Sequence, residues 1–156
     1  MVEVRFEELS LDTWEAVADL VVAPGQENFV APNIKTIAET QWYPWTHRRV
    51  IFDGPTIVGF AVYGRMSDDR DMWLHRFMIG GDHQGKGYGR AALRVLIEEW
   101  RAMPNVPLVK LSYEPNNVVA EALYVSEGFV PGEIADWGER VATLTFHPSA
   151  PPTDRL

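Results

Sequence analysis

The sequence of 156 residues contains no cysteine. This absence excludes disulfide bonds, thiolate nucleophiles and zinc sites of the cysteine type. Any nucleophilic or metal chemistry would therefore use other residue types. The cellular compartment is left open by the absence of cysteine.

Long apolar runs are also absent. No segment approaches the roughly 20 apolar residues that span a bilayer, although 46% of the residues are hydrophobic. Residues 1–6 alternate as a strand does, and they lack the basic and apolar segments of a secretory signal. We therefore expect a soluble protein with a cytoplasmic location.

Positive charge is scarce: 14 Lys and Arg stand against 22 Asp and Glu, a net charge of −8. Nonspecific binding to nucleic acid needs clustered Lys and Arg, so this balance argues against it. An acidic protein suits a cationic substrate. An acidic surface that merely keeps the protein soluble is the other interpretation, and the charge alone does not decide between them.

Length and hydrophobic content fit one compact domain, which we assign to residues 1–147, followed by a disordered tail at 148–156. Apolar periodicity and turn residues predict the elements inside it. The predicted helices are 14–22 after a Ser or Asp cap, 33–39 beginning at a capping Asn33, one from the glycine cluster to Pro104, and 117–127 ended by Gly128. The predicted strands are 1–6, 49–52 and 57–63 joined by a turn at Asp53 and Gly54, 72–79, 107–113, 132–136 and 141–146.

A glycine-rich segment lies between the predicted strand 72–79 and the long helix. It reads Gln84-Gly85-Lys86-Gly87-Tyr88-Gly89-Arg90. Unpaired amides at a helix start, together with the helix dipole, favour an anion. Glycine lets the backbone approach a diphosphate without a Cβ in the way, and Lys86 and Arg90 add charge at the edge. The segment therefore predicts a phosphate cradle.

Three other interpretations apply to such a segment. A Walker loop requires Ser or Thr after Gly-Lys, and Gly87 stands there, so the magnesium ligand is missing. The dinucleotide pattern G-x-G-x-x-A fits from Gly87 to Ala92, but no acidic residue ends the next strand as that pattern requires. A plain flexible glycine turn is the default for such a segment when it stands alone.

The glycine segment resembles the cofactor motif of the GCN5-related N-acetyltransferases (GNAT), which is Arg or Gln, two residues, Gly, one residue, and Gly or Ala. Gln84, Gly87 and Gly89 match it. Residues 117–124, followed by Gly128-Phe129, resemble the second motif of the family. The resemblance covers about residues 57–129. It implies an α/β (α+β) fold with a mixed, V-shaped sheet flanked by helices, and acetyl-coenzyme A as co-substrate bound at residues 84–90, with no metal.

The resemblance also implies roles for individual residues. Phe77, Met78 and Ile79 match the strand whose exposed backbone pairs with the pantetheine arm. Tyr124 matches the tyrosine that donates to the leaving thiolate, although its helix face would equally suit a core tyrosine. Asn117 matches a residue that contacts the cofactor arm, and Asn is also an ordinary helix cap.

The general base is predicted less directly. Many members of the family work through a water chain from Glu or His on the strand before the loop, and His75 occupies such a position. An imidazole pKa near 6.5 suits proton removal near neutrality, yet a lone strand histidine is often structural. Asp71 and Glu27 are the reserve candidates.

The acceptor is suggested by a narrower resemblance. Residues 58–64, 73–79 and 84–87 look similar to the bacterial spermine/spermidine acetyltransferases. A polyamine needs carboxylates and aromatic faces. The residues proposed to supply them are Glu27, Tyr43, Asp71 and Trp73, beside Trp42 and Trp45, which would equally suit a buried aromatic patch.

Several alternatives stay open at this point. Another primary amine, such as an aminoglycoside, an amino-acid derivative or a protein N-terminus, is the alternative acceptor. A binding module that retains coenzyme A for sensing is the alternative class. The sequence departs from the family at Gly80-Gly81, where Pro is frequent, and at Trp73, where some members carry a catalytic acid. A homodimer is compatible with the family, but no residue pattern fixes an interface.

Overall fold

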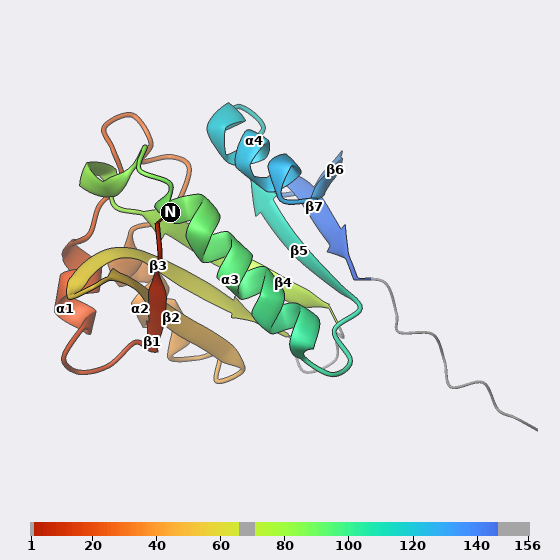
Figure 1. The fold of residues 1–156 in the computed structure, drawn as a ribbon. Coiled ribbons are helices and arrows are strands. Elements are labelled where there is room, and N and C mark those ends of the chain that lie inside the picture. The colour runs from red at the N-terminus through yellow and green to blue at the C-terminus, as the bar shows by residue number, and fades with distance from the viewer. Residues whose placement is uncertain (1, 66–70, 147–156) are drawn as a thin grey trace, which may run out of the picture.

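The computed structural model describes residues 2–65 and 71–146, and the tail predicted at 148–156 lies outside the described residues. In this part of the chain seven strands form one sheet in the order β1-β2-β3-β4-β5-β7-β6 (Figure 1). Neighbouring strands are antiparallel except β4 and β5, which are parallel. The strands are β1 Arg5–Glu8, β2 Thr46–Asp53, β3 Thr56–Gly64, β4 Met72–Ile79, β5 Leu108–Tyr113, β6 Val130–Ile134 and β7 Arg140–Thr145.

Helices cover both faces of this sheet, so the predicted mixed α+β architecture is confirmed. The helices are α1 Trp14–Asp19, α2 Asn33–Thr40, α3 Tyr88–Ala102 and α4 Val118–Ser126, with one 3-10 turn, η1 Gly81–His83. The core on one face joins α3 and α4 to β3, β4, β5 and β7. The core on the other face joins α1 and α2 to β2, β3 and the end of β4.

The long helix α3 follows directly from its sequence pattern. Its buried residues recur every three or four positions, which gives one apolar stripe against the sheet. These residues are Ala92, Leu93, Leu96, Ile97 and Trp100. The helix ends before Met103, which is extended with a ψ of 137°, because the residue ahead of Pro104 is disfavoured in the helical region. The predicted end is confirmed.

The prediction that Asn33 caps α2 was wrong. The residue at the N-cap is Pro32, and Asn33 is the first helical residue. Its buried side-chain amide donates instead to the main-chain oxygens of Val17, at 2.9 Å, and Leu20, at 3.2 Å. The Val17 carbonyl also accepts from the Leu20 amide at 3.2 Å, so Asn33 adds a second bond there and supplies a partner for the Leu20 carbonyl at the end of α1. The first helix therefore stops at Asp19, earlier than predicted, and the chain continues extended toward the site.

Candidate active site

The central feature of the site is the separation of β4 from β5. The two strands pair over three positions, from Met72 with Val109 to Leu74 with Leu111. Beyond Leu74, β4 pairs with β3 alone among the described residues, while β5 stays with β7. The sheet therefore opens into a V, and the second half of β4 has a free backbone edge facing the gap.

A β-bulge in β4 decides which side chains face this gap. Tyr63 pairs with Leu74 and Val62 pairs with Arg76, so His75 is the extra residue. Leu74 and Phe77 consequently lie on the same face of the sheet, in the core beneath α3, although three positions separate them. Without the extra residue, strict alternation would put them on opposite faces.

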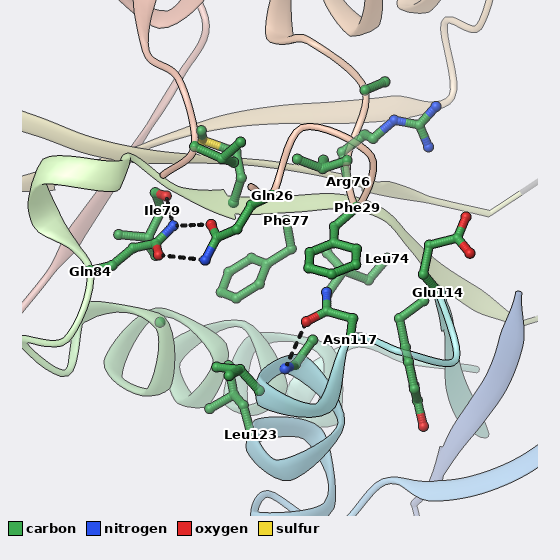
Figure 2. Close-up of a pocket in the computed structure, with 18 of the residues that line it drawn as sticks. Gln26, Phe29, Leu74, Arg76, Phe77, Ile79, Gln84, Glu114, Asn117 and Leu123 are labelled. Carbon is green, nitrogen blue, oxygen red and sulfur yellow. Dashed lines mark hydrogen bonds between the residues drawn. The ribbon is translucent and has the colours of Figure 1, made fainter. Parts of the chain in front are cut away.

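A cavity of about 640 Å³ occupies the open end of the V. Its walls come from β4, the glycine segment, the end of β5, the start of α4 and the segment between α1 and α2 (Figure 2). Of the residues predicted for the site, the cavity brings together Glu27, His75, Phe77, Met78, Ile79, Gln84, Gly85, Gly87, Tyr88, Gly89, Asn117 and Tyr124.

The glycine segment leaves a run of unused amides beside the cavity. Gly85 and Gly87 have φ values of 77° and 90°, a left-handed region that glycine adopts without strain. None of the amides of residues 85–90 donates to another residue in the described part of the chain, and the first such bond of α3 comes from Ala91 to Gly87. The 15-residue helix α3 thus begins with a group of free donors suited to an anion.

The side chains at the ends of this segment are held by protein groups. The Tyr88 hydroxyl donates to the carboxylate of Asp53, at the end of β2. Arg90 pairs with Glu127 at the end of α4, with 3.5 Å between Nη1 and Oε1. Lys86 is exposed and, like Arg90, does not line the cavity. The cradle is therefore a main-chain feature, with the basic side chains at its rim.

Tyr124 lies in the cavity wall with its side chain almost entirely buried. It is 8% exposed, and its ring packs against Tyr113 and Phe129. Burial, with the nearby Tyr113 and Glu139, raises the pKa of Tyr124 above its ordinary value. The phenol is therefore protonated near neutral pH and can act as a hydrogen-bond or proton donor.

Asn117 combines two functions at one position. It caps α4, since its side-chain oxygen accepts from the amide of Ala120 at 3.3 Å, and it also lines the cavity (Figure 2). Phe29, which comes from the segment between α1 and α2, lines the same cavity.

His75 lies at the bulge between two tryptophan rings. Ring centroids are 5.4 Å apart for Trp45 and 6.4 Å apart for Trp73. Its Nε2 atom is buried without a hydrogen-bond partner among the described residues. Burial first, and then the charge of Arg76, lower the pKa of His75 from 6.5 to about 4. The imidazole is therefore neutral at physiological pH, and it is a weaker base than an ordinary histidine.

Three residues proposed for the acceptor lie outside the cavity lining. Asp71 pairs with Lys110 at 2.7 Å, and the ammonium group of Lys110 also lies over the Trp73 ring, 5.7 Å from its centroid. Tyr43 packs against Trp45 at the surface, with 5.5 Å between ring centroids. These residues form an aromatic and charged layer behind His75.

The cavity contains residues that sequence reasoning missed. Glu114 and Glu139 add carboxylates, and Gln26 and Phe29 come from the segment between α1 and α2. Glu114 directly follows β5, which is parallel to β4, so its place near the open edge could have been inferred from the strand order. Glu139 precedes β7, and no local pattern in the sequence indicates that it reaches the site.

A sheet that opens beside an anion-binding glycine loop defines a class of protein, the acyltransferases that take their acyl group from a nucleotide-linked thioester. The sequence matches the Acetyltransferase (GNAT) family over residues 14–129, most of the chain, and the protein belongs to this family. It is an acyltransferase, and acetyl-coenzyme A is its acyl donor.

A relative agrees with this assignment, and solved structures agree with the fold. The chain is 30% identical over 137 residues to the spermine/spermidine N(1)-acetyltransferase of Bacillus subtilis (strain 168), covering 83% of this chain and 90% of that protein. Among solved structures, an acetyltransferase from Thermus thermophilus superposes with a TM-score of 0.76 at 17% identity, over 93% of this chain and 98% of that one. A spermidine N-acetyltransferase from Vibrio cholerae, in complex with CoA and spermine, gives 0.74 at 15% identity, over 92% and 95%.

The residues present fit the acyl donor. The unused main-chain amides of residues 85–90 can donate hydrogen bonds to a pyrophosphate. The free edge of β4 has main-chain groups that can pair with the amides of a pantetheine arm. Among the described residues, we find no group of three or more His, Cys, Asp or Glu placed to hold a metal ion. Within the same residues, no helix has the length and apolar character needed to cross a bilayer.

Proposed function

We propose that the protein transfers the acetyl group of acetyl-coenzyme A directly to a primary amine, and that the amine is a polyamine such as spermidine or spermine. The observation that carries the proposal is the composition of the cavity at the open end of the sheet. It has unused main-chain donors on one side and the carboxylates of Glu27, Glu114 and Glu139 elsewhere in its wall. In Figure 2, Glu114 lies across the cavity from Gln84.

Carboxylates in a partly enclosed site favour a substrate with several positive charges. A polyamine has ammonium groups spaced along a flexible chain, so one group can approach the donor while another pairs with a carboxylate. The relative in Bacillus subtilis, at 30% identity, is a spermine/spermidine N(1)-acetyltransferase, which supports the same acceptor class here. Glu27 keeps its proposed role in binding the acceptor. Tyr43, Asp71 and Trp73 lie in the layer behind His75, so their contribution to acceptor binding is indirect.

The donor side of the proposal rests on main-chain geometry. Bound acetyl-coenzyme A supplies an acetyl group already activated as a thioester. The amides of residues 85–90 hold its pyrophosphate, with Lys86 and Arg90 at the rim, and Asn117 together with the edge formed by Phe77, Met78 and Ile79 orients the arm. Holding two reactants in the correct orientation is the largest part of the catalysis required.

Two side chains move protons in this proposal. Tyr124, kept protonated by its burial, donates to the sulfur as it leaves. His75, neutral at physiological pH, accepts the proton from the attacking amine, directly or through water. With a pKa of about 4 it holds that proton only briefly and passes it to solvent.

The proposal is tested by an amine panel with acetyl-coenzyme A, in which free thiol release is measured for spermidine, spermine, an aminoglycoside, a simple monoamine and a peptide with a free N-terminus. We expect kcat/KM to be about tenfold higher or more for the polyamines than for the monoamine, from one or more additional ion pairs. If the peptide or the aminoglycoside were turned over faster than the polyamines, the acceptor would belong to that class of amine instead. Binding of coenzyme A with no turnover of any amine would indicate a sensor.

Glu114→Gln tests the carboxylate side within the same assay. We expect KM for spermine to rise about tenfold, with a much smaller change for the monoamine, because only the longer substrate reaches the carboxylate. Glu133→Gln, an exposed position on β6, is the matched control and should leave both values unchanged.

A further inference from the structure

Two segments far apart in the sequence meet at the site as one unit. The first is the segment 20–27 after α1, and the second is the connection 80–87 between β4 and α3. The Gly81 amide donates to the main-chain oxygen of Val21 at 2.7 Å. A Cβ on Gly81 would lie 2.8 Å from the backbone of Ala23. Glycine is therefore required here, which accounts for Gly80-Gly81 where the family often has Pro.

A pair of glutamine side chains makes a second link between these segments. Gln26 Nε2 donates to Gln84 Oε1 at 3.0 Å, and Gln84 Nε2 donates to Gln26 Oε1 at 2.8 Å (Figure 2). Gln84 Nε2 also donates to the main-chain oxygen of Ile79 at 2.9 Å. Because a carbonyl oxygen can only accept, the bond to Ile79 fixes the orientation of the Gln84 amide, and this in turn fixes the orientation of Gln26.

The position of Gln26 makes this pair important for the site. Gln26 lies in a turn, since its amide donates to Ala23 and its carbonyl accepts from Phe29. The residues that follow it line the cavity. A second cavity of about 610 Å³ lies against the same segment and shares Glu27, Val30 and Pro32 with the first. Val30 packs this segment against the core on the α1 and α2 face, and the glutamine pair holds its first residue.

We propose that Gln26 is a positioning residue that, through Gln84, sets the geometry of the glycine loop and couples it to the segment 26–31. Gln84 is the first residue of the loop, and it directly precedes the unused main-chain amides of residues 85–90. A change in the position of the Gln84 side-chain amide therefore shifts the main chain where these donors begin. The inference rests on the proposed function only through Glu27, the residue of this segment that is proposed to bind the acceptor. The effect of Gln26 on coenzyme A is independent of which amine is acetylated.

The test is a double-mutant cycle on coenzyme A binding, measured by calorimetry with the full chain and no amine. Gln26→Ala should weaken binding about tenfold, the scale expected for two lost hydrogen bonds. Gln84→Ala should weaken it by the same factor or more. The double variant should bind within about twofold of Gln84→Ala, because Gln26 acts through that residue. Gln41→Ala, at the exposed end of α2, is the control and should bind as the wild type does.

A restored pair makes the test more specific. Gln26→Glu alone should weaken binding, because a carboxylate would face the acceptor oxygen of Gln84. Combining it with Gln84→Arg should recover binding to within about threefold of wild type, because a guanidinium can donate both to the Ile79 carbonyl and to the introduced carboxylate. The family motif, which accepts Arg or Gln at this position, makes the second substitution compatible with the loop.

Hydrogen exchange of the protein without coenzyme A provides a second readout. The amides of Gly81, His83 and Gln84, which donate to Val21, Gly80 and Gly81, should exchange about tenfold faster in Gln26→Ala than in wild type. Additive losses in the double variant would show that Gln26 contacts coenzyme A directly and would overturn the proposal, as would unchanged affinity and exchange in Gln26→Ala. Neither readout uses an amine, so failure of the polyamine proposal would leave this inference standing, and the reverse also holds.

Discussion

The rings of Tyr113 and Tyr124 pack together with 5.7 Å between their centroids, but their hydroxyl groups have different surroundings. The Tyr113 hydroxyl donates to Glu121 at 2.8 Å, whereas the Tyr124 hydroxyl has no hydrogen-bond partner among the described residues. The Tyr124 oxygen is not among the fully buried side-chain atoms that lack a partner in the described residues, and Tyr124 lines the cavity, so its hydroxyl can donate to a group bound there. A substrate that supplies the partner would account for keeping it there.

Tyr124→Phe should therefore reduce turnover with little effect on donor binding. We expect kcat to fall by about 100-fold or more, the scale of general acid catalysis, while the Kd for coenzyme A stays within about threefold of wild type. Thiol release at saturating substrates and calorimetry give the two values. Tyr113→Phe, the adjacent ring, is the control and should retain most of the activity. Unchanged turnover in Tyr124→Phe would remove its assigned role.

Gly89→Ala should separate folding from binding. A Cβ there would meet Leu123 and Ile79 at 3.5 and 3.7 Å, ordinary contact distances. Alanine also favours the helix by up to about 1 kcal/mol, so Tm should be unchanged or higher. Binding of coenzyme A should nevertheless weaken by about tenfold or more, because the Cβ obstructs the approach of the pyrophosphate to the free amides.

Gly54→Ala should give the reverse result and is the matched control. Gly54 has a φ of 55° in open space in the β2–β3 turn, so a Cβ strains the backbone without touching the site. Tm should fall while coenzyme A affinity is kept. A Gly89→Ala variant with wild-type affinity would count against the main-chain cradle.

His75 should make folding stability sensitive to acid. Its pKa in the folded protein is about 4, below the unfolded value of 6.5, so the unfolded chain binds more protons between these values. Stability is therefore fully present above about pH 6.5 and is lost as pH falls toward 4. The loss between pH 7.5 and pH 5 should be about 2 kcal/mol from this residue.

The measurement is urea unfolding at both pH values. His75→Gln should lose less stability than wild type on acidification, by about the same 2 kcal/mol. If His75→Gln showed the full wild-type difference, the low pKa would be incorrect, and His75 would again be a candidate for an acidic limb near pH 6.5 in the pH–rate profile.

Arg49→Met should destabilise the fold without changing the site. Arg49 Nη1 donates to the Tyr63 hydroxyl at 2.7 Å and to Glu99 at 3.0 Å, which ties β2 and β3 to α3. Its side chain is 15% exposed. Loss of these bonds should lower the free energy of unfolding by about 2 kcal/mol, as measured by urea unfolding. Arg48→Met, the preceding residue of β2, should change it by less than about 0.5 kcal/mol.

Much of this architecture could be predicted because its signals are local. The strand Met72–Ile79 has the predicted bounds, and the glycine segment leads into α3 where apolar periodicity begins. The hairpin between β2 and β3 follows from Asp53 and Gly54. In each of these elements the signal lies within a few residues of the structure that it specifies.

What could not be predicted depends on contacts between distant segments. Asn33 looked like a cap, but its amide is used by α1, and no property of its neighbours indicates this. The bulge at His75 is visible only once β3 is aligned with β4. The Gln26–Gln84 pair joins positions 58 residues apart, and although Gln84 matches the motif, no pattern around Gln26 indicates that it is the partner.

Residue 75 contributes to the site in two ways. Its side chain provides an imidazole, and its place in the bulge determines which face of the sheet each later residue of β4 occupies. Replacing the imidazole changes what faces the cavity while the strand keeps its count of residues. Deleting position 75 would instead turn the last part of β4 over, so that Phe77 and Ile79 would face α1 and α2 and Met78 would face α3. A one-residue gap at this site should therefore disrupt the packing of β4, whereas a substitution should change only the chemistry beside the cavity.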